Sequence, residues 1–166
     1  MKKSYMRRWA ICICAFVLAV STVTAQKKKV LPEAATPYFT LPTEAPSTPT
    51  EDGFLQRWML LEPISAPVRT NTVFTDSYLR EKFYNDYLPT VMLRLPKDGS
   101  TQQVGKETLR WHALDSKLFN VKLFRFATSF EKQKYGVVFW AVTASDSPEE
   151  MTDGRLAIGS NGASMW

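Results

Sequence analysis

The chain of 166 residues contains one histidine, His112, which lies three positions before Asp115. A serine hydrolase needs a serine hydroxyl, a histidine that takes its proton and a carboxylate that holds the histidine. The sequence has no Gly-x-Ser-x-Gly elbow, which presents the nucleophile in many esterases. Residues three apart in a strand point to opposite faces, so His112 and Asp115 are not expected to pair. We therefore predict no catalytic residue and interpret His112 as a half-exposed strand histidine.

Carboxylate chemistry and calcium binding stay open on sequence grounds. The 16 acidic residues provide many pairs for glycosidase chemistry, but spacing alone gives no distances between them. The pair Glu149 and Glu150 follows Pro148 and is interpreted as part of a solvated turn. Calcium held by turn carbonyls and a carboxylate such as Asp98 or Asp153 is a second alternative. No histidine or cysteine cluster, Gly-x-Gly loop or Walker pattern occurs, so no metal or cofactor is predicted.

Aromatic side chains make up 13% of the chain and offer flat faces on which sugar rings can stack. The residues considered for this role are Trp58, Trp111, Trp140, Trp166, Tyr84, Tyr87 and Tyr135. Trp58 and Trp140 lie inside apolar runs and are predicted to belong to the core. Trp111 has charged or polar neighbours on both sides, and Tyr84 and Tyr87 lie in a predicted helix. These three residues are our sugar-stacking candidates.

The first 25 residues have the three parts of a cleavable signal peptide. A basic start is followed by the apolar run 9–20, and Val23 and Ala25 place small residues before a cleavage site after Ala25. Spanning a bilayer takes about 20 apolar residues, more than this run contains. We therefore predict a secreted or periplasmic protein without a stable membrane span after cleavage.

The charge and the cysteines of the chain also belong mainly to its N-terminal end. The sequence pI is about 9.2, yet residues 51–166 carry 14 basic and 14 acidic residues. A neutral folded part argues against a nucleic acid as partner. Both cysteines, Cys12 and Cys14, lie in the apolar run, so the mature chain is predicted to contain no disulfide or thiol.

The mature chain divides into a spacer and a folded part. Residues 26–50 begin with three lysines and continue with prolines and threonines, which predicts a disordered, extended spacer. Residues 51–166 are predicted to fold. One helix is predicted: it begins at Thr75 or Asp76, carries Leu79, Phe83, Tyr84 and Tyr87 on one face, and ends at Pro89.

Short apolar or alternating runs predict strands in the rest of the folded part. The predicted strands cover residues 54–61, 91–95, 109–113, 123–126, 135–143 and 156–160. The run 135–143 has the composition of a central strand buried on both faces. Turns are predicted at 96–99 and at Asn161-Gly162. The pattern indicates a mostly β protein built as an antiparallel β-sandwich with one short helix, and because it stops in mid-strand at Trp166 we expect the module to be incomplete there.

Four strings of the folded part resemble a known module. They are residues 54–64 (FLQRWMLLEPI), 71–80 (NTVFTDSYLR), 111–121 (WHALDSKLFNV) and 159–166 (GSNGASMW). Together they are similar to the jelly-roll-like accessory region of secreted acetylxylan esterases from glycan-degrading gut bacteria, over about residues 53–166. The resemblance implies a non-catalytic module that contacts a glycan such as xylan, or packs against a hydrolase domain. The hydrolase domain itself is missing from this chain, so no catalytic residue is carried over.

Two alternatives come from other functional classes. The chain could be a small serine esterase that uses His112 with a nearby serine. It could also be a purely structural secreted β-sandwich protein.

Overall fold

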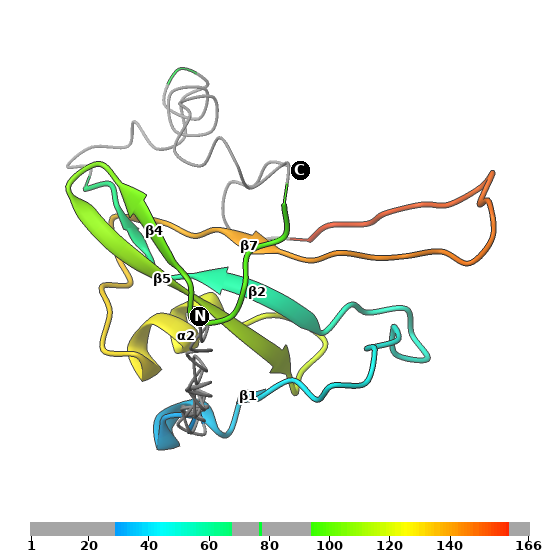
Figure 1. Cartoon of the computed structure of the whole chain (residues 1–166), viewed down its shortest axis with the longest axis horizontal. Coiled ribbons are helices and arrows are strands. Elements are labelled where there is room, and N and C mark those ends of the chain that lie inside the picture. The colour runs from blue at the N-terminus through cyan, green and yellow to red at the C-terminus, as the bar shows by residue number, and fades with distance from the viewer. Residues whose placement is uncertain (1–28, 68–76, 78–93, 160–166) are drawn as a thin grey trace, which may run out of the picture.

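The computed structural model describes residues 29–67, 77 and 94–159 (Figure 1). The elements are η1 (Glu33–Ala35), β1 (Phe39–Thr40), β2 (Arg57–Leu61), β3 (Ile64–Ser65), β4 (Thr101–Val104), β5 (Glu107–Ser116), α2 (Leu123–Ser129), β6 (Val137–Val138) and β7 (Ala141–Val142). All strand pairs among them are antiparallel. The predicted mostly β class with a helix is therefore confirmed. No helix of these described residues is long and apolar enough to cross a membrane.

The long strand β5 organises the larger sheet. The sheet has the order β1-β5-β2-β7, and β4 also pairs with β5. Along one edge of β5, β4 pairs with its first residues and β1 with its last two. Strand β2 takes the other edge, where Leu60 lies opposite His112. A hairpin joins β4 to β5 at Gly105, whose φ of 58° suits the first position of a two-residue turn.

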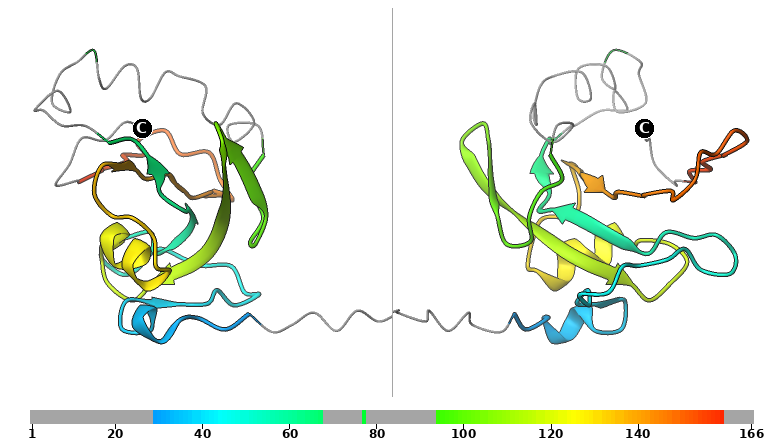
Figure 2. Two further views of the ribbon diagram at one scale, coloured as in Figure 1. Left: turned by 90° about the vertical axis from the view of Figure 1, so that its left-hand side faces the viewer. Right: turned by 45° about the vertical axis from the view of Figure 1, so that its right-hand side comes forward.

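Both faces of this sheet are buried because side chains alternate along β5 and β2. One face holds a core cluster of Met59, Leu61, Ile64, Val104, Leu109 and Trp111. The other face holds a second cluster of Ala35, Phe39, Leu60, Leu114 and Phe126. The second cluster receives its side chains from the N-terminal segment and from α2, which lie on the same side of β5 (Figure 2).

The predicted strand 123–126 is wrong, because these residues begin α2. Leu123, Phe126, Ala127 and Phe130 recur at helical spacing, and all four pack in the second core cluster or are fully buried. The short run of large apolar residues also fits a strand. The helix is favoured here because its one apolar stripe covers Leu60 and Leu114 of the sheet.

The predicted central strand 135–143 is also wrong. The structure divides this run into β6, which pairs with β3, and β7, which pairs with β2. Between the two strands, Phe139 packs against the second cluster and Trp140 against the first, so the run bridges both faces of the sheet. Its side chains are exposed or half-buried. The buried central strand is instead β5, whose alternating polar residues had indicated a half-exposed strand.

The predicted disordered spacer 26–50 is wrong for part of its length. Residues 33–40 form η1 and β1, and the side chains of Ala35 and Phe39 are fully buried. Main-chain contacts hold the segment at two neighbouring places. Strand β1 pairs with β5, and next to this pairing the Lys117 N–H donates to the Tyr38 carbonyl. The prolines do not prevent this, because β1 itself contains none.

The other sequence expectations have mixed outcomes. Strand 109–113 is confirmed within the longer β5, and strand 54–61 is confirmed from Arg57 to its expected end before Pro63. The turn 96–99 is confirmed, with Gly99 at a φ of 74°. Residues 94–95 and 156–159, the described parts of two other predicted strands, are not in strands. The predicted helix, apart from Ser77, and the turn at Asn161-Gly162 lie outside the described residues.

We predict that the N-terminal segment contributes to folding stability. Phe39→Ala should lower the free energy of unfolding by about 3 to 5 kcal/mol, because it removes a fully buried ring. Val30→Ala, in the same segment but with Val30 83% exposed, should change little. Chemical denaturation monitored by tryptophan fluorescence measures both values. Equal stabilities for the two variants would contradict the packing of residues 33–40 on the sheet.

Candidate functional site

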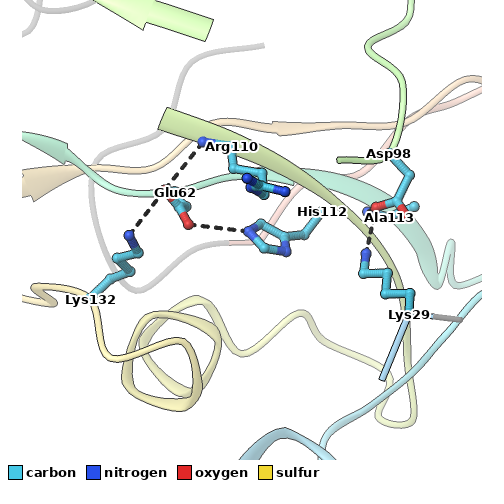
Figure 3. A network of polar contacts seen from close by, with 7 residues as sticks. All are labelled: Lys29, Glu62, Asp98, Arg110, His112, Ala113 and Lys132. Atoms are coloured by element: carbon cyan, nitrogen blue, oxygen red, sulfur yellow. Dashed lines mark hydrogen bonds and ion pairs between the residues drawn. The ribbon is translucent and has the colours of Figure 1, made fainter. Parts of the chain in front are cut away.

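Glu62 lies at the point where β2 stops pairing with β5. Its N–H donates to the Arg110 carbonyl, and the following Pro63 has no N–H to continue the ladder. The Glu62 side chain folds back, and its Oε2 accepts a hydrogen bond of 3.2 Å from the Arg110 N–H. A carboxylate thus takes the place of a strand carbonyl. The residue is buried, so this charge needs further partners (Figure 3).

His112 and Lys132 supply those partners. The His112 Nε2 atom lies 3.3 Å from Glu62 Oε1, and the Lys132 Nζ atom lies 3.2 Å from Glu62 Oε2. His112 comes from β5, and Lys132 follows α2 in the chain. Figure 3 shows the lysine and the histidine approaching the carboxylate from different sides. The three side chains therefore join β2, β5 and the C-terminal end of α2.

The ring of His112 is enclosed between the sheet and α2. Its centroid lies 4.3 Å from that of Phe130 and 5.5 Å from that of Phe126. When Nε2 donates to Glu62, Nδ1 keeps a lone pair that has no hydrogen-bond partner among the described residues. Burial lowers the pKa of His112 below its ordinary value of 6.5, against the opposing hydrogen bond to Glu62. Protonation would also place an N–H at Nδ1, where no described residue accepts a hydrogen bond.

This arrangement corrects the expectation of a half-exposed histidine. Glu62 holds His112 as a carboxylate holds the base of a serine hydrolase. The other ring nitrogen, Nδ1, is however buried, and no serine hydroxyl of the described residues bonds to it. Proton transfer to a substrate requires hydrogen-bond reach. The geometry favours a structural clamp that fixes α2 to the sheet.

A second carboxylate, that of Asp98, accepts a main-chain hydrogen bond at the opposite edge of β5. Asp98 Oδ1 accepts a 2.7 Å hydrogen bond from Ala113 N–H, in the gap between the parts of β5 that pair with β4 and β1. Lys29 forms an ion pair with the same carboxylate. Burial raises the pKa of Asp98, but the bonds from Lys29 and Ala113 outweigh it, and the pKa lies below the ordinary value.

Calcium binding gains no support from the described part of the chain. Asp98, one of the two candidate carboxylates, is already bonded to Lys29 and Ala113. Within residues 29–67 and 94–159, no three histidine, cysteine or acidic side chains form a group that could hold a metal ion.

The sugar-stacking candidates from the sequence are not brought together. Trp111 is only 1% exposed and belongs to the first core cluster, so it has no free face for a sugar, which corrects our prediction. Tyr84 and Tyr87 lie outside the described residues. Trp58 and Trp140 pack against the core clusters, as predicted.

His112 and Asp115 are separated, as their spacing predicts. His112 binds Glu62 on the α2 side of the sheet. Asp115 instead forms a bidentate pair with Arg57, its neighbour across β2 and β5, through two hydrogen bonds of 2.8 Å.

An exposed aromatic pair lies at the start of α2, and we call it the Phe124–Tyr135 surface. Phe124 is 52% exposed and Tyr135 is 67% exposed, and their ring centroids lie 5.7 Å apart. The half-buried ring of Phe139 supports Phe124 at 6.0 Å. Lys134 places its Nζ 5.5 Å from the centroid of the Tyr135 ring.

Sequence reasoning considered Tyr135 for stacking but did not find Phe124. Phe124 was missed because its segment was interpreted as a strand. The helical spacing of Phe126, Ala127 and Phe130 was the available signal, since it leaves Phe124 outside the buried stripe.

Comparison with protein-family models, with curated proteins and with solved structures finds no match for this chain.

We predict that acid destabilises the protein through His112, the one histidine of the chain. Below its ordinary pKa of 6.5 the unfolded chain takes up a proton that the folded protein resists, so stability should fall as pH falls. His112→Gln keeps a donor for Glu62 but does not titrate. Melting temperatures between pH 8 and about 5.5 should decline more for the parent than for this variant. Parallel curves would contradict the buried neutral histidine.

Proposed function

We propose that the chain is a non-catalytic accessory module of a secreted, xylan- or glycan-degrading protein similar to acetylxylan esterases. In this proposal it contacts glycan through the Phe124–Tyr135 surface. The observation that carries the proposal is the pair of large aromatic side chains that meet edge to face, at an interplanar angle of 65°, with more than half of each residue exposed. Neighbouring aromatic rings at a protein surface offer apolar faces to the C–H groups of sugars.

The rings of Phe124 and Tyr135 are attached to well-packed parts of the fold. Phe124 belongs to α2, whose buried side places Phe126 and Ala127 against the sheet. Tyr135 is followed by Gly136, whose carbonyl accepts a hydrogen bond from Ala66 N–H at the end of β3. A ligand meeting this surface therefore orders few side chains, which lowers the entropic cost of binding.

The enclosed histidine supports the non-catalytic part of the proposal. The side chains of His112 and Glu62 are at most 10% exposed, so a substrate does not reach this carboxylate–histidine pair. The alternative of a small serine esterase that uses His112 is correspondingly disfavoured.

The sandwich fold of the module and its export from the cell are parts of the same proposal. A jelly-roll-like sandwich is supported by the packing of Ile64 from β3 and Val138 from β6 against the cluster around Trp111. Export through a signal peptide cleaved after Ala25 is supported by the basic and apolar parts of residues 1–25.

The proposal predicts a loss of xylan binding when the exposed ring is removed. Tyr135→Ala should weaken retardation by xylan in affinity electrophoresis severalfold, because a stacking ring contributes on the order of 1 kcal/mol. Phe119→Ala is the matched control, since Phe119 is 66% exposed and pairs with Phe54 instead. An unretarded parent chain, or equal loss in both variants, would count against this surface.

Packing against a neighbouring hydrolase domain is a second candidate, favoured by the segment after β7. Residues 144–159 run out from the sheet as an arm (orange to red in Figure 1), and Met151, Leu156 and Ile158 are exposed on it. Large apolar side chains exposed in one short segment are typical of docking surfaces.

The second candidate predicts that these apolar residues do not stabilise the described fold. The double variant Leu156→Ser and Ile158→Ser should keep the parent melting temperature and raise solubility, because it removes exposed apolar surface. Differential scanning fluorimetry and a precipitation assay measure the two quantities. A melting temperature lowered by several degrees would show that the arm packs on its own chain.

A further inference from the structure

The segment around α2 has a strong excess of positive charge. Residues 122–135 contain four basic residues and one acidic residue, and the basic ones are Lys122, Arg125, Lys132 and Lys134. The range 51–166 as a whole is neutral, so this excess is local. The Phe124–Tyr135 surface lies within this basic segment.

Most of this charge has no acidic partner. Lys132 is bound to the buried Glu62. Arg125 lies over the ring of Tyr38, and Lys134 lies over the ring of Tyr135. Among the described residues, neither Arg125 nor Lys134 forms an ion pair.

Lys134 is the cation with the most definite position beside the stacking surface. It is half-buried, and its Nζ lies 5.5 Å from the centroid of the Tyr135 ring. A long side chain whose stem is packed in this way loses less conformational entropy when it binds an anion. The structure therefore places a positive charge over one of the two exposed aromatic rings.

We propose that the Phe124–Tyr135 surface binds acidic polysaccharide, with a uronic acid carboxylate paired to Lys134 and the sugar ring against Tyr135 or Phe124. The inference rests on the proposed function and names its ligand class. A hexuronate combines an apolar sugar face with one carboxylate, which matches rings and a cation in contact. A neutral glycan leaves the Lys134 charge unpaired.

The test compares two forms of one polysaccharide. Glucuronoxylan and the same polymer with its carboxyl groups reduced to alcohols differ in charge alone. The purified chain should bind the acidic form about twofold to fivefold more tightly, the range expected for one exposed ion pair. Raising the salt concentration should shrink this preference, because exposed charges are screened.

Variants assign the preference to particular side chains. Lys134→Gln should abolish the preference, because affinity for the acidic form falls to that for the reduced polymer. Lys106→Gln, an exposed position in the β4–β5 hairpin, should keep the preference. Melting temperatures check that every variant is folded.

The outcomes separate the inference from the proposed function. Equal binding of the acidic and reduced polymers would overturn the inference while leaving glycan contact in place. A preference that survives in Lys134→Gln would also overturn it. Binding of neither polymer would overturn both the inference and the proposed function. Equally tight binding of polyglutamate at matched charge density would show a general anion surface and overturn the assignment to sugars.

Discussion

The described structure depends on a single long strand, β5, that pairs at both edges and packs against a core cluster on each face. β5 is 10 residues long, and β1, β4 and β2 pair along it. Its odd residues, including Leu109 and Trp111, enter one core cluster, and its even residue Leu114 enters the other. The N-terminal segment and α2 contribute to the same cluster as Leu114. Each of these elements is held by contacts that begin on β5 or on its neighbour β2.

Two main-chain N–H groups of β5 lie where no neighbouring strand accepts them, and a carboxylate accepts each. Where β2 ends before Pro63, Glu62 accepts the N–H of Arg110. Where neither β4 nor β1 reaches, Asp98 accepts the N–H of Ala113. Buried main-chain N–H groups are costly without acceptors. Each carboxylate in turn attracts hydrogen-bond donors, which explains why the ammonium groups of Lys132 and Lys29 and the neutral imidazole of His112 gather around β5.

The basic aromatic surface follows from the same packing. Because α2 turns Phe126 and Ala127 toward the sheet, Phe124 points away from it and meets Tyr135 after the chain leaves the helix. Lys132 is used to neutralise Glu62, whereas Lys134 lies against an exposed ring. Two lysines two positions apart thus have different roles. One belongs to the interior network, and the other belongs to the proposed binding surface.

Local sequence signals predicted the parts of the fold that are governed by neighbouring residues. An apolar run predicted the strand at 54–61, alternation predicted the strand at 109–113, Pro63 predicted the end of β2, and the Gly99 turn was found by its composition. The separation of His112 from Asp115 followed from strand geometry. These features were predictable because side-chain alternation, the missing proline N–H and the positive φ of glycine act within a few residues.

Burial and partnership were decided by tertiary structure. The sequence around Trp111 indicated exposure, but pairing on both edges and packing on both faces enclosed it. The run at 135–143 looked like one strand, yet it divides because Phe139 and Trp140 pack on opposite sides of the sheet. Glu62 meets His112 across 50 positions of the chain. The amino-acid sequence by itself determined the mostly β character and the turn at Gly99, whereas the buried clamp and the exposed aromatic pair arise from contacts between segments of the chain that lie apart in sequence.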